Sequence, residues 1–419
     1  MAESMKGLKR THRCTEVTAK NIGETVTVMG WVAKQRNKGG IIFVDLRDRS
    51  GILQLIFEED KCGSENFEKA MKLRSEYVVA VVGKVEKRAG ATNENLKTGD
   101  IEVIAEQVRI LSESETPPFP IEENSKTKEE IRLKYRYLDL RRPDLQRNLI
   151  LRSKICTEVR AFMAKEGFIE IETPILNKST PEGARDYLVP SRIHPGSFYA
   201  LPQSPQLFKQ LLMCSGYDRY IQIAKCFRDE DLRADRQPEF TQIDMELSFV
   251  DAEDVMEVNE RLIQHVCKEA IGLDVQLPLP RMTWQDAMDR FGSDKPDLRN
   301  PLRIIDVTDF FQKCTFKPFI GKTVRAIRVH ADMSKGFHEK LLKFATGLGM
   351  GGLGYLEVLE DGSYKGPIDK FIPDDCKEEF RTLAGLEVGD TIFFMADKEE
   401  RAAYYACLLY TSPSPRDTR

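Results

Sequence analysis

Apolar and polar residues alternate along five segments of the first 111 residues, with the period of two that is typical of β-strands. A helical pattern at residues 65–74 falls between the third and the fourth segment. Five strands with a helix between strands three and four predict an OB barrel, whose sheet face often binds single-stranded nucleic acid. The predicted strands are residues 25–32, 41–48, 52–58, 77–85 and 101–111.

Phe43 lies within the second predicted strand, and basic residues cluster around the first two strands. An aromatic ring among positive charges can serve as a stacking platform for a base. A single Phe in a strand is more often a core residue, and the residues alone favour that interpretation. The basic residues around it are Lys34, Arg36, Lys38, Arg47 and Arg49.

Residues 112–130 are rich in Pro, Ser and Glu and are predicted to be a linker. Helical periodicity follows, and the segment GFIEIETPIL, residues 167–176, has the pattern of a strand. Further helical patterns are found at residues 135–148, 151–167, 205–218 and 251–272.

A third region, from about residue 297 to residue 400, mixes helical and strand patterns around glycine-rich turns. Gly347, Gly349 and Gly352 match G-x-G-x-x-G, the spacing of a dinucleotide-binding loop. That loop must follow a strand and open a helix, whereas this one follows the predicted helix at 337–346 and precedes a strand. We therefore interpret the glycines as a turn and a helix cap.

The stretch FRDEDLRADRQPEF, residues 227–240, is densely charged yet lies between two alternating segments. A calcium loop starting at Asp229 fails, because its sixth position is Ala234 and its twelfth is Phe240. In the outgoing segment one face is expected to be core and the other to form a polar pocket floor. From the residues alone, a solvated hairpin and a nucleotide site remain equally favoured. The core face comprises Ile243, Met245, Leu247 and Phe249, and the polar face Gln242, Asp244 and Glu246.

The composition narrows the class of protein. The net charge is -4, so the chain as a whole does not have the basic character of many nucleic-acid binders, and no apolar run is long enough for a membrane span. Nine cysteines without zinc-type spacing, and no secretory signal, predict reduced thiols in a soluble, cytoplasmic protein.

Residues 227–244 resemble motif 2 of the class II aminoacyl-tRNA synthetases, and most closely that of the bacterial-type aspartyl-tRNA synthetases. The resemblance covers most of the chain and includes several long motifs. It implies a multidomain α+β protein with an N-terminal OB β-barrel, a class II catalytic core on an antiparallel sheet, and an α+β insertion domain. Besides the OB region, the resembling segments are 167–176 (motif 1), 180–192, 200–213 and 292–301.

The resemblance implies that the chain joins L-aspartate to tRNA through an aspartyl-adenylate, with ATP as substrate and Mg²⁺ as cofactor. Chemistry of this kind depends on positioning and charge neutralisation more than on a nucleophile. A sibling ligase (asparaginyl- or lysyl-tRNA synthetase, or a related asparagine synthetase) and a non-catalytic tRNA-binding fragment are the alternatives.

Site residues follow from the resemblance by motif. Arg228 is implied to be the catalytic residue that bridges the α-phosphate and the aspartate carboxylate. Glu230 and Gln237 are implied to contact ATP. The aspartate site is implied to comprise Glu182, Gln206, Lys209, Arg228 and Asp244, with Lys209 facing the side-chain carboxylate and Glu182 the ammonium group.

In the OB barrel the resemblance implies anticodon recognition, with Phe43 stacking on a base and thus outside the core. Arg36, Gln54 and Glu102 are implied to lie near the neighbouring bases. Motif 1 implies a homodimer. The partner that the resemblance implies is tRNA(Asp), and whether tRNA(Asn) is also charged stays open.

The sequence departs from the family towards its end, because motif 3, whose arginine clamps ATP, is not found. We expect a truncated gene whose last dozen or so residues are not native, with the Mg²⁺ ligands in the missing part and none in this chain. Such a chain is expected to be inactive or poorly folded. The predicted divisions are an anticodon-binding domain (1–111), a linker (112–148), a catalytic core (149–296), an insertion domain (297–400) and a terminal segment (401–419).

Overall fold

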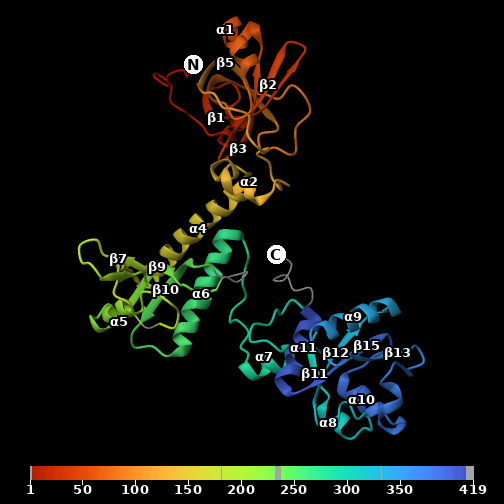
Figure 1. Ribbon diagram of the computed structural model, residues 1–419. Coiled ribbons are helices and arrows are strands. Elements are labelled where there is room, and N and C mark those ends of the chain that lie inside the picture. Colours follow the sequence, from red (N-terminus) through yellow and green to blue (C-terminus); the bar gives the residue numbers. More distant parts are fainter. Residues whose placement is uncertain (1, 181, 232–236, 332, 412–419) are drawn as a thin grey trace. The chain divides into compact units, whose positions relative to one another are not determined.

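The computed structural model describes residues 2–180, 182–231, 237–331 and 333–411 (Figure 1). These residues form two compact units. The first comprises the described residues of 1–171, 211–223 and 245–275, and the second those of 172–210, 224–244 and 276–419. No helix in the described part of the chain is long and apolar enough to cross a membrane.

The first unit begins with a closed five-stranded barrel in the strand order β1-β2-β3-β5-β4. Neighbouring strands are antiparallel except β3 and β5, which are parallel. The helix α1 (Glu59–Lys72) lies between β3 and β4 in the chain, as the OB prediction requires. The strands are β1 (Thr25–Lys38), β2 (Ile41–Asp48), β3 (Gly51–Phe57), β4 (Val78–Lys87) and β5 (Ile101–Ser112).

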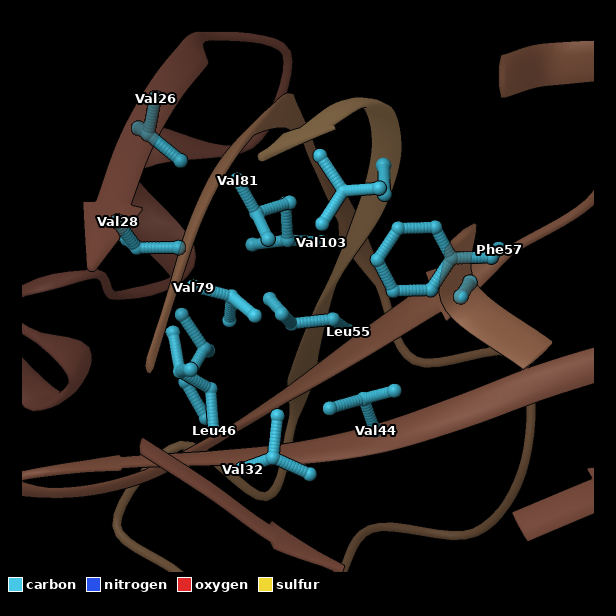
Figure 2. Close-up of a cluster of buried hydrophobic side chains, with 14 of the residues drawn as sticks. Val26, Val28, Val32, Val44, Leu46, Leu55, Phe57, Val79, Val81 and Val103 are labelled. Carbon is cyan, nitrogen blue, oxygen red and sulfur yellow. The ribbon is translucent and has the colours of Figure 1, made fainter. Parts of the chain in front are cut away.

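Alternate residues of the barrel strands fill its interior, where Val26, Val28, Leu46, Leu55 and Val81 meet (Figure 2). Burial of this apolar surface is the main force that closes a small barrel of this kind. On β2, Ile42 and Val44 are completely buried, whereas the intervening Phe43 is only half-buried and lies outside the core cluster. The interpretation of Phe43 as a core residue is therefore wrong, because strand alternation turns its ring to the outer face.

Helices follow the barrel within the first unit. The predicted helix at residues 135–148 is broken, because Pro143 opens a new helix and disfavours helical backbone before it. α4 packs against α6, which begins at a capping box on Asp251 and ends at Gly272 with φ 72°. The helices are α2 (Glu129–Lys134), α3 (Arg136–Asp139), α4 (Pro143–Lys165) and α6 (Ala252–Ile271).

A buried ion cluster joins the barrel to the segment after α3. The Glu76 side chain is 2% exposed, and its carboxylate lies 2.7 Å from an Nη atom of both Arg47 and Arg141. The Arg141 guanidinium also stacks over Trp31 of β1, 4.9 Å from the ring centroid. Glu76 has φ 67°, an uncommon value for a residue with a side chain, so the cluster holds the backbone in a strained conformation.

A three-stranded sheet in the order β10-β9-β6 carries the charged stretch between β9 (Arg219–Phe227) and β10 (Glu239–Leu247). The strand predicted at 167–176 is shorter, since only β6 (Ile169–Glu170) pairs, in parallel with β9. The helix α5 (Gln206–Cys214) precedes β9. A small hairpin of β7 (Leu188–Pro190) and β8 (Phe198–Ala200) lies between β6 and α5 in the chain.

The predicted core face of β10 is only half correct. Met245 and Leu247 pack against the core formed by α4 and α6. Ile243 is 44% exposed and Phe249 98% exposed, because the helical core does not reach Ile243 and Phe249 follows the strand with φ 57°. On the predicted polar face, Asp244 is the buried residue, at 8% exposure.

The last part of the chain forms a five-stranded sheet in the order β11-β12-β15-β13-β14, with two separate apolar cores. Phe310, Phe311 and Phe380 of α8 and α10 belong to one core, and Ala345 and Tyr405 of α9 and α11 to the other, so helices cover both faces (Figure 1). The strands are β11 (Ile304–Asp306), β12 (Thr323–His330), β13 (Gly354–Val358), β14 (Tyr364–Lys365) and β15 (Asp390–Asp397). The helices are α7 (Trp284–Phe291), α8 (Thr308–Gln312), α9 (Lys335–Gly347), α10 (Lys377–Ala384) and α11 (Glu399–Thr411).

The G-x-G-x-x-G match joins the end of α9 to β13, as a turn and not as a nucleotide loop. α9 ends at Gly347, and Gly349 has φ 91°, which favours glycine. α11 extends beyond residue 400, where the sequence analysis ended the insertion domain, and its Ala402, Ala406 and Leu409 are buried. Residues 412–419 of the predicted terminal segment lie outside the described residues.

Candidate functional site

A buried ion pair joins α5 to β10. Lys209 Nζ lies 2.9 Å from Asp244 Oδ1, and the two side chains are 12% and 8% exposed. Asp244 Oδ2 is buried without a hydrogen-bond partner, which is costly for a carboxylate oxygen. Gln206 is the first residue of α5 and lies one turn before Lys209, so the helix presents both side chains in one direction.

Cys226, near the end of β9, was missed by the sequence analysis and lies among these charges. Its thiol donates to Gln242 Oε1 across 3.3 Å. Burial first, and then the negative charge of Asp244, raise the pKa of Cys226 to about 11, while Arg228 and Lys209 act in the opposite direction. Cys226 is therefore a neutral thiol that lies among the charged groups of this site. Strand alternation alone could have placed it on the same face as Arg228.

Arg228 follows the last residue of β9. Its backbone N–H donates to the Pro238 carbonyl across 2.9 Å, and its guanidinium lies over the Phe240 ring at 5.0 Å from the centroid. The ring holds the flat guanidinium in place while leaving its edge for oxygen ligands. Glu230 and Gln237 are exposed, and residues 232–236 between them lie outside the described residues, including the Ala234 position of the calcium-loop test.

Glu182 lies on the loop before β7. Its Oε2 accepts a 2.7 Å hydrogen bond from Ser204 Oγ, and its Oε1 accepts a longer one from Thr180 Oγ1 at 3.4 Å. Together with Asp186 and Leu207, these residues line a cavity of about 150 Å³. The loop thus places a carboxylate beside the start of α5.

A larger cavity, of about 460 Å³, lies on the outer face of the barrel. All four predicted anticodon residues line it, namely Arg36, Phe43, Gln54 and Glu102. Gln54 and Glu102 are each 4% exposed, and Gln54 Nε2 donates to Glu102 Oε2 across 3.1 Å. Arg36 is held by Asp45, with Nη2 2.6 Å from Oδ1.

Arg88 also lines this cavity and was not predicted. Its Nη2 donates to Gln54 Oε1 across 3.0 Å, and its Nη1 is buried without a hydrogen-bond partner. The Ala89 backbone N–H donates to Glu102 Oε1 across 3.0 Å, so both ends of the Gln54–Glu102 pair are fixed. The position of Arg88 directly after β4 was the only signal, and loop residues cannot be placed from periodicity.

Within the described residues, no group of three or more His, Cys, Asp or Glu side chains is placed to hold a metal ion.

Two protein families match this chain, one over the barrel with its cavity and one over the segment that contains Lys209, Asp244 and Arg228. Residues 26–111 match the OB-fold nucleic acid binding domain, and residues 128–402 match the class II tRNA synthetases of the D, K and N group. The chain belongs to the class II aminoacyl-tRNA synthetases. The resemblance to the bacterial-type aspartyl-tRNA synthetases is confirmed by bacterial relatives, named aspartate–tRNA ligases, that are 66% and 63% identical to this chain.

Among similar proteins, the Aspartate–tRNA(Asp/Asn) ligase of Lachnoclostridium phytofermentans is 66% identical over 407 residues, which are 96% of this chain and 68% of that protein. The Aspartate–tRNA ligase of Agathobacter rectalis is 63% identical with the same coverage. The synthetase chain therefore spans about two thirds of the length of these relatives.

Solved structures support the same fold. The crystal structure of asparaginyl-tRNA synthetase from Pyrococcus horikoshii complexed with asparaginyl-adenylate matches 96% of this chain with a TM-score of 0.58 and 20% identity. The aspartyl-tRNA synthetase from Entamoeba histolytica matches 97% of it with a TM-score of 0.56 and 18% identity. At this identity the likeness concerns the fold alone.

Proposed function

We propose that this chain belongs to a synthetase that activates L-aspartate with ATP and joins it to tRNA. The observation that carries the choice of amino acid is the nearly buried Lys209–Asp244 pair. A fixed ammonium group suits a substrate with a side-chain carboxylate, whereas asparagine presents no charge to it. The close relatives that are named aspartate–tRNA ligases support the same assignment.

In the first step, the aspartate α-carboxylate attacks the α-phosphate of ATP. A bond forms between a carboxylate oxygen and the α-phosphorus. The bond between the α-phosphorus and the α,β-bridging oxygen breaks, and pyrophosphate leaves with the electron pair. Arg228, steadied by Phe240, neutralises the charge between the α-phosphate and the carboxylate. Glu230 and Gln237 contact ATP, and they are proposed on the family resemblance.

Three further groups hold the amino acid during this step. Lys209 pairs with the side-chain carboxylate, and Asp244 fixes the direction of the Lys209 ammonium. Glu182 meets the substrate ammonium group, and Gln206 lies one turn from Lys209 on the same helix. Because the reaction is accelerated mainly by orientation, small displacements of these groups are expected to be costly.

In the second step, the 3′-oxygen of the terminal tRNA adenosine bonds to the activated carbonyl carbon and the hydroxyl releases its proton. The bond between that carbon and the phosphate oxygen breaks, and AMP leaves with the electron pair. The barrel cavity supports anticodon binding, with Phe43 stacking on a base and Gln54, Glu102 and Arg36 reading its neighbours. We propose tRNA(Asp) as the partner. The relatives include ligases named for tRNA(Asp) alone and for tRNA(Asp/Asn), so both tRNAs belong in the assay.

Several further features are proposed with this function. A homodimer through motif 1 is supported by the exposed apolar side chains of Ile169, Ile175 and Leu176. Mg²⁺ accompanying ATP rests on the family resemblance alone. Residues 1–111, 112–148, 149–296 and 297–400 are proposed as anticodon-binding, linking, catalytic and insertion segments. A cytoplasmic location is supported by the free state of all nine cysteines.

We also propose that these 419 residues do not complete adenylate formation by themselves. Motif 3, whose arginine clamps ATP in this family, is not found in the sequence, and in the described residues no group of three or more His, Cys, Asp or Glu side chains is placed to hold a metal ion. The test is aspartate-dependent ATP–pyrophosphate exchange by the purified chain, with asparagine and lysine as competing amino acids. Exchange with aspartate would overturn the inactivity, and exchange with asparagine or lysine alone would overturn the choice of substrate.

A further inference from the structure

Gln203 is a buried amide that binds the loop carrying Glu182. The residue is 2% exposed and lies just before α5. Its Oε1 accepts from the Ala184 backbone N–H across 3.0 Å, and its Nε2 donates to the Ala184 carbonyl across 3.0 Å. The side-chain amide thus pairs with both backbone groups of Ala184 in the way that a neighbouring strand would.

The same amide also holds Asp186, two residues further along the loop. Gln203 Nε2 donates to Asp186 Oδ1 across 2.6 Å, and Ser179 Oγ donates to Asp186 Oδ2 across 2.5 Å. On the other side, the Asp229 N–H donates to the Arg185 carbonyl across 3.0 Å. The segment 184–186 is therefore fixed to the start of α5 and to the residue that follows Arg228.

Glu182 lies just outside this fixed segment. Gly183 separates it from Ala184 and has φ 102°, a backbone conformation that residues with a side chain rarely adopt. Glu182 at present accepts from Ser204, the residue next to Gln203. The loop thus has a fixed end at Ala184, and one glycine separates this end from Glu182.

We infer that Gln203 is a positioning residue for aspartate binding: it fixes Ala184 and Asp186 so that Glu182 is placed over the amino-acid site. The inference rests on the proposed role of Glu182 towards the substrate ammonium group. Gln203 acts through the loop and does not itself touch the substrate. Loss of its hydrogen bonds is expected to cost amino-acid affinity and to leave ATP affinity unchanged.

The test compares Gln203→Leu with the wild-type 419-residue chain by two measurements. Hydrogen exchange of the Ala184 amide is expected to become at least about tenfold faster, since its acceptor is lost. Calorimetric titration is expected to show aspartate binding weakened by about tenfold or more, with the Kd for ATP changed less than about twofold. Gln285→Leu, at an exposed position of α7, is the matched control and should change neither.

A double variant separates positioning from a general structural effect. If Gln203 acts through Glu182, Gln203→Leu should cost little further aspartate affinity in a Glu182→Gln background. If Gln203→Leu does not fold, Asp186→Ala removes one of the three hydrogen bonds and should show a smaller effect in the same direction. Unchanged Ala184 exchange, or faster exchange with unchanged aspartate affinity, would overturn the inference.

Failure of the proposed function gives a different result. In that case the wild-type chain binds neither aspartate nor a non-hydrolysable aspartyl-adenylate analogue. The Ala184 exchange rate then decides by itself whether Gln203 fixes the loop: faster exchange in Gln203→Leu retains the positioning role, and an unchanged rate removes it.

Discussion

Asp244 Oδ1 lies 2.9 Å from Lys209 Nζ, at a point where a strand and a helix enclose both side chains almost completely. A buried ion pair of this kind seldom adds much stability, because desolvation of the two charges offsets their attraction. Its value lies in orientation, since the carboxylate fixes the direction of an otherwise flexible ammonium group. The thiol of Cys226 near this pair is neutral, so it adds no negative charge that would compete with Asp244 for the Lys209 ammonium group.

Lys209→Met should therefore abolish most of the affinity for aspartate. Charged hydrogen bonds contribute about 1.5–3 kcal/mol, and the variant also leaves Asp244 unpaired, so a loss of about 50-fold or more is expected. Calorimetric titration with aspartate and with ATP separates the two sites. Lys225→Met on β9, whose ion pair with Glu239 is more than half exposed, is the control and should change aspartate binding less than about twofold. Wild-type affinity in Lys209→Met would rule out this lysine as the carboxylate ligand.

Glu76→Gln should destabilise the barrel by about 3–5 kcal/mol, because it leaves Arg47 buried without its charged partner. Urea unfolding can be followed by Trp31 fluorescence in a Trp284→Phe background, since these are the two tryptophans of the chain. Glu65→Gln removes an exposed pair with Lys69 and should cost less than about 0.5 kcal/mol. Equal losses of stability in Glu76→Gln and Glu65→Gln would show that the buried Glu76 cluster stabilises the barrel no more than an exposed ion pair does.

The stability of the barrel should fall at acid pH in part through Asp48. Burial alone would raise the pKa of Asp48, but hydrogen bonds from Ser50 and from the Cys14 backbone hold it below its ordinary value of 3.8. A carboxyl with a lowered folded pKa stabilises the fold above its unfolded pKa, and this contribution is lost as the pH falls through the folded value. The stabilisation that Asp48 provides is therefore lost below about pH 4.

Asp48→Asn should lower the free energy of unfolding at pH 7 by about 1–3 kcal/mol and flatten its decline below pH 4. Urea unfolding at a series of pH values measures both effects. The exposed Asp60→Asn is the comparison, and it should change the free energy of unfolding at pH 7 by less than about 0.5 kcal/mol. An unchanged slope in Asp48→Asn would mean that other carboxyls cause the acid loss.

The sequence predicted the barrel well where burial and the period of two coincide, as they do on β2 at Ile42 and Val44. It failed for Ile243, since the alternation of β10 does not show where a covering helix ends. Most of the strand predicted at 167–176 was also absent, because sheet pairing depends on partners distant in the chain.

The candidate site was predicted through motifs more than through periodicity. Lys209 and Asp244 were named from the family resemblance, and the structure brings them together. Cys226, Gln203 and Arg88 were missed because each gains its role from contacts with other segments. A buried amide such as Gln203 has no local signature, since its partners at Ala184 and Asp186 lie on a different loop.

Phe43→Ala should weaken binding of the tRNA(Asp) anticodon stem-loop by about 5- to 150-fold, the range expected when one aromatic stacking contact of about 1–3 kcal/mol is lost. The ring lies outside the barrel core, so the variant should unfold at the same urea concentration as the wild type. Phe249→Ala, at a residue that is 98% exposed and distant in sequence from the barrel, is the matched aromatic control. Fluorescence anisotropy with a labelled stem-loop at fixed salt measures both affinities, because phosphate contacts make binding salt-dependent. A Phe43→Ala chain that binds the stem-loop as tightly as Phe249→Ala would show that the ring does not stack on a base, even though it lines the cavity with Gln54 and Glu102.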